Sequence, residues 1–191
     1  MSDQNIVQQA WQAASDKQTQ AQADYPELGC LSGCNDCCKH HGSPMTYAQE
    51  WDCIADWLAQ HPQVYQQARI QYTQLKQTLQ VRLAKSEVPT ISGALFEAPC
   101  PFLQDERCAV YPVRPMTCRA FGNTTLAPHP SSGEQIYTCN PEKDRWEQLL
   151  PMLQEPCVLP ERTDLFAPLA NWGQPRSLLS WLERAMHADT R

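Results

Sequence analysis

The sequence predicts a mainly α protein whose helices pack around an irregular, cysteine-rich metal-binding centre with a short β-hairpin. Three observations lead to this prediction. Apolar residues recur at helical spacing over 3–23 and 46–85. Helical periodicity then fails, and 13 of the 16 prolines lie from Pro89 onward. Finally, eight of the ten cysteines fall in two groups, within 30–38 and 100–139.

The composition excludes several classes of protein. A length of 191 residues suits one domain, 1–191, and 42% hydrophobic with 19% charged residues is typical of a globular chain. No run of 18 apolar residues is present, so no membrane association is expected. A net charge of −6 without a basic run argues against nucleic-acid binding. The Gly-rich motifs that bind nucleotide phosphates are absent as well.

The amino terminus has neither a basic nor an apolar signal region, which predicts a cytoplasmic protein. Thiols stay reduced in that compartment, so clustered cysteines there are more often metal ligands or redox groups than disulfides.

The first half of the chain is expected to be helical. Over 3–23 the apolar residues on one face are Ile6, Val7, Ala10, Trp11 and Ala14. Thr46 followed by Gln49 predicts a capping box for a second helix, which His61 and Pro62 end. Pro62 suits the first turn of a third helix that runs to about Lys85.

The second half is expected to be irregular, with a few elements. Residues 100–103 and 108–111 flank four polar residues and predict a short hairpin. Residues 135–138 could form a strand, Asn140 caps a helix to about Leu150, and a last helix covers 175–188. The domain is therefore divided into an N-terminal helix over 1–25, a metal-binding core over 28–140 and C-terminal helices over 141–191.

The first cysteine group comprises Cys30, Cys34, Cys37 and Cys38. Thiolates select zinc or iron–sulfur clusters, and a C-x2-C spacing presents two sulfurs to one metal from a tight turn. The spacing C-x3-C-x2-C also resembles the triad of radical SAM enzymes. That interpretation fails because the chain has too few strand signals for their βα-repeat barrel.

The second group is spread along the chain as Cys100, Cys108, Cys118 and Cys139. Nearby prolines would hold these sulfurs in place with little loss of entropy. Arg107, Arg114 and Arg119 interrupt an acidic chain, and they could offset the charge of several thiolates or be ordinary solvated residues. Arg114 and Arg119 lie inside the motif and are the candidate cofactor-binding residues.

Together these residues resemble the CxxCxxCC (YkgJ-type) family, which is described as a putative zinc- or iron-chelating domain. The matching motif runs from Cys30 to Cys139 and includes Cys100-Pro-Phe-Leu and Cys108-x-Val-Tyr-x-x-Arg-Pro-x-x-Cys118-Arg. The x3 gap after Cys30 departs from the x2 in the family's name. Bacterial flagellin lysine methylases carry a similar cysteine set, thought to hold a [4Fe–4S] cluster. The resemblance thus implies a metal-binding protein with a redox or methyl-transfer role.

The spacing alone leaves the metal open. Eight thiols are enough for two four-cysteine sites, or for one site with thiols to spare. Structural zinc favours two facing C-x2–4-C pairs, which the second group lacks, whereas a dense cysteine run with a remote Cys-Pro is closer to iron–sulfur ligation. Zinc remains the alternative. The protein would then be a zinc-stabilised interaction module or a metal-handling protein without catalytic activity. No partner protein or electron donor is indicated.

Two cysteines lie outside the motif, and two histidines lie next to its first cysteine group. Cys53 and Cys157 fall outside the motif and are expected to serve in packing. His40 and His41 directly follow Cys38, so they could complete a metal site or lie on a loop surface.

Overall fold

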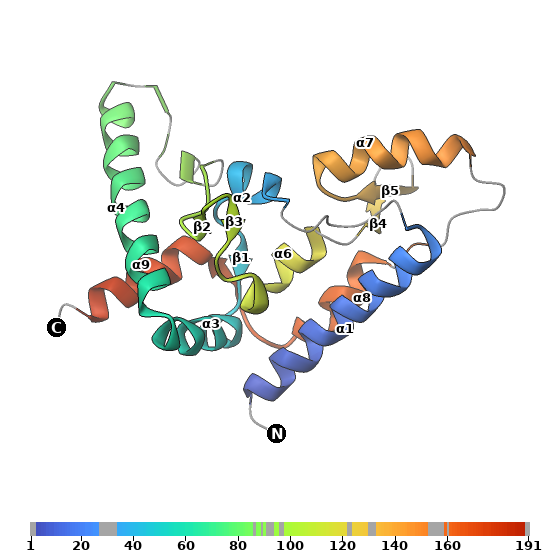
Figure 1. The fold of residues 1–191 in the computed structure, drawn as a ribbon, viewed down its shortest axis with the longest axis horizontal. Helices are drawn as coiled ribbons and strands as arrows, with labels where there is room; N and C mark the ends of the chain where they lie inside the picture. Colours follow the sequence, from blue (N-terminus) through green and yellow to red (C-terminus); the bar gives the residue numbers. More distant parts are fainter. Residues whose placement is uncertain are drawn as a thin grey trace. The chain divides into compact units, whose positions relative to one another are not determined.

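A computed structural model describes residues 3–26, 34–85, 87–88, 90, 94–95, 98–121, 124–129, 133–152, 159 and 161–189. Helices dominate these residues, and the strands form small antiparallel pairs, which confirms the predicted mainly α fold with a short hairpin (Figure 1). The chain divides into two compact units: unit 1 is Met1–Asp36 with Met116–Gly173, and unit 2 is Cys37–Pro115 with Gln174–Arg191. The predicted domain boundaries remain a prediction.

The core of unit 2 is built by α3 (Ala48–Gln60), α4 (Pro62–Ala84) and α9 (Leu178–Ala188). Each helix buries an apolar stripe at helical spacing, as the sequence predicts. The buried side chains of the three helices include Trp51, Ile54, Leu58, Ala68, Tyr72, Leu178, Leu179 and Leu182. Pro62 is the first residue of α4, where its missing N–H costs no helical hydrogen bond.

The start of α3 differs from the expected capping box. Thr46 belongs to strand β1 (Met45–Thr46), which pairs antiparallel with β6 (Arg176–Ser177). The Thr46 hydroxyl donates to the Pro44 carbonyl at 3.2 Å. Tyr47 is the N-cap instead, and its N–H donates to the Glu50 carboxylate at 3.1 Å. The predicted capping box was therefore one residue early, because Thr46 belongs to a paired strand and is not the N-cap.

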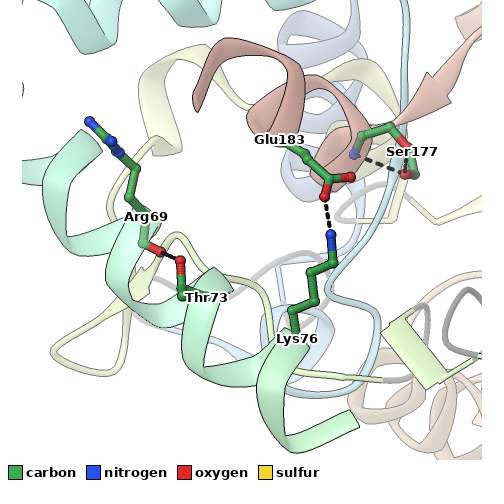
Figure 2. Close-up of polar contacts among 6 residues, drawn as sticks. Arg69, Thr73, Lys76, Ser177 and Glu183 are labelled. Carbon is green, nitrogen blue, oxygen red and sulfur yellow. Dashed lines mark hydrogen bonds and ion pairs between the residues drawn. The ribbon is translucent and has the colours of Figure 1, made fainter. Parts of the chain in front are cut away.

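Polar side chains join α4 to α9 (Figure 2). Lys76 of α4 forms an ion pair with Glu183 of α9. Ser177 caps α9, since its hydroxyl accepts from the Ser180 N–H at 3.2 Å. This cap starts the helix at Leu178, three residues later than the sequence predicts, because residues 176–177 pair with β1.

The predicted hairpin is confirmed as β2 (Leu103–Gln104) paired with β3 (Arg107–Cys108). Its two central residues, Asp105 and Glu106, have φ values of 48° and 59°. A two-residue turn with both residues in the left-handed region matches the natural twist of paired strands. A short η1 helix (Tyr111–Val113) follows.

Unit 1 contains α1 (Asp3–Asp24), α6 (Met116–Phe121), α7 (Asn140–Leu149) and α8 (Arg162–Phe166), with short η2 (Leu150–Met152) and η3 (Ala167–Leu169) helices. Strands β4 (Thr125–His129) and β5 (Gly133–Tyr137) pair antiparallel. On α1 the predicted stripe buries Val7, Ala10, Trp11 and Ala14. Trp146 of α7 is 1% exposed and packs against Leu159 and Tyr25.

Three elements of unit 1 were not predicted. Helix α6 follows Pro115 directly, in a segment expected to be irregular. Strand β4 contains Pro128, which a two-stranded ribbon tolerates at an edge. Helix α8 has only five residues, too few to show a period. Within the described part of the chain, no helix combines the length and apolarity needed to cross a membrane.

Candidate metal centre

Helix α2 (Asp36–His40) carries the first two thiols of the centre. Cys37 and Cys38 are consecutive residues on this single turn, and both are half-buried. The turn is closed by the His41 N–H, which donates to the Cys37 carbonyl at 2.9 Å. The helix therefore ends at His40, and His41 and Gly42 follow it.

Gly42 lets a distant segment approach this turn. Its N–H donates to the Ala98 carbonyl at 2.9 Å, and the Cys100 N–H donates to the Cys38 carbonyl at 2.7 Å. A Cβ at position 42 would lie 2.1 Å from the Ala98 oxygen and 2.6 Å from the Cys100 nitrogen. Only glycine allows this backbone contact, which holds Cys100 beside Cys38.

The hairpin supplies the fourth thiol. Cys108 on β3 pairs with Leu103 on β2, and the Leu103 N–H donates to the Cys100 carbonyl at 2.9 Å. Phe102, 0% exposed, anchors the turn in the core, and its carbonyl accepts from the Ala109 N–H at 2.8 Å. The hairpin therefore fixes Cys108 relative to Cys100.

These residues form a four-thiol cluster of Cys37, Cys38, Cys100 and Cys108. Cys38 is hydrogen-bonded to Cys108 and Cys37, and Cys100 interacts electrostatically with Cys108 and Cys37. All four lie in unit 2. Residues more than 60 positions apart along the chain are thereby brought together as one set of soft sulfur donors.

Burial and mutual contact govern ionisation in the cluster. The hydrogen bond to Cys108 raises the pKa of Cys38 far above its ordinary value, with contributions from Cys37 and from burial. The same bond lowers the pKa of Cys108. Burial raises the pKa of Cys100 to about 12. The cluster therefore keeps protons on Cys38 and Cys100, and metal binding must displace them.

Arg114 is a buried positive charge near the cluster, at 7% exposure. Its charge is a further cause that lowers the pKa of Cys108. Its guanidinium carbon lies 3.6 Å from the centre of the Tyr111 ring, which holds the side chain in place. A fixed cation beside a thiolate would offset the negative charge of a loaded centre.

The other predicted ligands are placed as follows. Cys34, Cys118 and Cys139 belong to unit 1: Cys34 precedes α2, Cys118 is on α6, and Cys139 precedes α7. Cys30 lies outside the described residues. Arg119, also in unit 1, donates to the Ser15 hydroxyl at 3.3 Å and lies over the Trp11 ring at 4.8 Å. The assignment of these residues to the site remains a prediction.

The cysteines and histidines outside the motif have different surroundings. Cys53 is buried on α3, whereas Cys157 lies outside the described residues. His40 is exposed at the end of α2, and His41 is half-buried in the residues that follow. Burial of Cys53 on a core helix accords with the predicted packing role. His40 is on the surface, but as the last residue of a helix and not on the predicted loop.

The donor chemistry fits a thiophilic metal. The described cysteines are thiols rather than disulfides. Among the described residues, no group of three or more His, Cys, Asp or Glu side chains is placed so that it could hold a metal ion, and the four thiols contact one another instead. Their sulfur atoms, with Arg114 as a neighbouring cation, suit zinc or an iron–sulfur centre and do not suit calcium or magnesium.

Sequence reasoning missed Gly42. The chain has only seven glycines, and this one follows the cysteine run by four residues. A glycine so close to candidate ligands is a usable signal for close backbone approach. The partner segment, residues 98–100, could not be identified from spacing.

Comparison with known proteins identifies the family of the chain. The model of the CxxCxxCC family, described as "Putative zinc- or iron-chelating domain", matches residues 29–144. The chain belongs to the CxxCxxCC family. The matched range includes all eight cysteines of the predicted ligand set, and therefore the whole four-thiol cluster. Among curated proteins and solved structures, no match was found.

Proposed function

We propose that this CxxCxxCC protein binds an iron–sulfur cluster through the four-thiol cluster and uses it in redox chemistry. The observation that carries the proposal is the meeting of Cys37, Cys38, Cys100 and Cys108 from three separate segments. Four cysteine thiolates are the usual ligand set of such a cluster.

One further feature supports iron–sulfur ligation. Arg114, buried near Cys108, supplies a charge that would raise the reduction potential of the cluster.

Zinc is the second candidate, and a different observation supports it. Cys38 is in hydrogen-bonding contact with both Cys37 and Cys108, and such close sulfurs suit the edges of a single zinc tetrahedron. A zinc-bound protein would act as a stabilised interaction module or as a metal-handling protein. Methyl transfer, implied by the resemblance to the methylases, is a further role for the loaded centre.

The clustered cysteines and the net charge of −6 support a cytoplasmic protein that works with another protein and not with nucleic acid. The electron partner would be a protein whose surface complements the net charge of −6.

Absorption and elemental analysis test the proposal. The protein is purified without oxygen from cells supplied with both iron and zinc. Brown protein with equal amounts of iron and acid-labile sulfide, and a visible band that bleaches on reduction, would support the iron–sulfur centre. Colourless protein with stoichiometric zinc and no sulfide would favour the second candidate, and protein without any metal would refute both.

A further inference from the structure

A pocket lies beside the four-thiol cluster, inside unit 2. Its volume is about 290 Å³. One wall is a face of α4 that carries Gln71, Gln74, Leu75 and Thr78, and the other is formed by residues 99–101 and Leu103. Cys100 is the described residue that belongs both to this pocket and to the four-thiol cluster.

The chemistry of the walls defines what the pocket could hold. The described lining residues carry apolar, amide and hydroxyl side chains, and none of them is charged. A volume near 290 Å³ is at the lower end of ligand pockets, which span about 300–1,000 Å³. The pocket therefore suits a small, uncharged molecule.

The wall that carries Cys100 is stiff. Pro99 and Pro101 flank the cysteine, and each fixes its own φ. The Gln71 side-chain amide donates to the Leu103 carbonyl at 3.4 Å, which ties the end of this segment to α4. The opening is thus maintained by the fold.

We propose that this pocket is the port through which a small, uncharged ligand reaches the metal centre, with Cys100 as the thiolate that it displaces. This inference rests on the proposed metal-binding function. With a metal held by the four thiols, the incoming ligand would supply an electron pair in place of the one from the Cys100 sulfur, and the released thiolate would take up a proton from solvent. No oxidant or reductant is needed.

Two threonines of α4 provide a matched test. Both threonines are exposed, but Thr78 lines the pocket and Thr73 lies outside it. Each hydroxyl donates to the carbonyl four residues earlier, at 2.9 Å for Thr78 and 2.8 Å for Thr73 (Figure 2 shows the bond from Thr73 to Arg69). Replacing either threonine by tryptophan removes the same kind of bond, but only Thr78→Trp fills the port.

The first measurement needs no metal. The reduced full-length protein, stripped of metal, is treated with iodoacetamide, a small uncharged alkylating agent, and modification of Cys100 is followed by mass spectrometry. Thr78→Trp should slow the reaction of Cys100 by about tenfold, or ~1.4 kcal/mol in the barrier, whereas Thr73→Trp should leave it unchanged. Equal rates in both variants would overturn the port.

The second measurement uses the loaded protein. Cobalt(II) is bound, and its visible thiolate bands are followed after addition of excess o-phenanthroline, an uncharged chelator. Thr78→Trp should slow metal loss by about tenfold with no change in the amount bound, and Thr73→Trp should not. Metal loss at wild-type rate from Thr78→Trp would overturn the proposal, whereas a wild-type protein that binds no cobalt would refute the proposed function instead.

A second pair guards against misfolding. Gln74 lines the pocket, and Gln77 is an exposed glutamine of the same helix outside it. If Thr78→Trp loses helical circular dichroism, Gln74→Trp and Gln77→Trp replace the threonine variants in both measurements, with the same outcomes expected.

Discussion

Replacing Gly42 by alanine should dismantle the four-thiol cluster without touching a cysteine. The new Cβ would lie 2.1 Å from the Ala98 oxygen, 2.5 Å from the Pro99 carbonyl carbon and 2.6 Å from the Cys100 nitrogen. All three are backbone atoms, so no side chain can rotate away. Residues 98–100 must move, and Cys100 moves with them.

The free-energy cost of this substitution has two parts. The hydrogen bonds from Gly42 to Ala98 and from Cys100 to Cys38 break, at about 1 kcal/mol each. Overpacking adds about 1–3 kcal/mol. The total of about 3–5 kcal/mol opposes the arrangement that binds metal, and each 1.4 kcal/mol corresponds to about tenfold in affinity. Metal affinity should therefore fall by at least about 100-fold.

The assay is competition for cobalt(II) or zinc against a chelator of known affinity, with circular dichroism to confirm that the helices remain. Gly173→Ala is the matched control. Gly173 has a φ of +83°, and a Cβ there meets nothing within 4 Å. That variant should lose about 1–2 kcal/mol of stability to backbone strain but should keep its metal affinity. Wild-type affinity in folded Gly42→Ala protein would refute the role assigned to this glycine.

Three further predictions concern individual side chains. Cys108→Ser should lower the amount of metal bound per chain. Cys53→Ala should lower the free energy of unfolding by on the order of 1 kcal/mol and leave the metal content unchanged. Equal metal content in the two variants would show that Cys108 is not a metal ligand. Burial raises the pKa of Cys100 from 9.0 to about 12, so the contribution of this group to the stability of the metal-free protein should be full below pH 9 and should be lost as the pH rises toward 12. Urea unfolding at several pH values measures this loss, and Cys100→Ala should make it smaller but not abolish it, because the pKa values of Cys53, Tyr65 and Tyr72 are raised as well. The hydrogen bond from Lys76 lowers the pKa of Glu183. Glu183→Gln should therefore lower the free energy of unfolding by about 0.2–1 kcal/mol at neutral pH, and by progressively less as the pH falls below 4.5. A difference that stays constant across that pH range would contradict the ion pair.

Much of the helical fold could be predicted because the determining signals are local. The stripe on α1, the proline at the start of α4 and the polar turn between β2 and β3 each lie within a short window of sequence. Helix α6 was missed because the proline-rich second half was expected to be irregular, although proline also precedes helices, as Pro115 does here. Strand β4 was missed because its pairing with β5 decides its conformation.

Only the local part of the candidate site could be predicted from the sequence. Residue type and spacing identified Cys37, Cys38, Cys100 and Cys108 as metal-ligand candidates, but spacing could not say which thiols meet. That is decided by backbone contacts between segments about 60 residues apart, and Gly42 makes room for them. The pocket beside Cys100 arises from the packing of α4 against residues 99–103, which no local pattern encodes.

The role of the four-thiol cluster as the metal site is tested most directly by the metal content of a variant that lacks two of its thiols. Iron, zinc and acid-labile sulfide per chain are measured in full-length protein purified without oxygen, for the wild type and for the Cys38→Ala, Cys100→Ser double variant. Iron with an equal amount of sulfide is expected in the wild type, and neither is expected in the folded double variant. A double variant that retains the full wild-type complement would contradict this role.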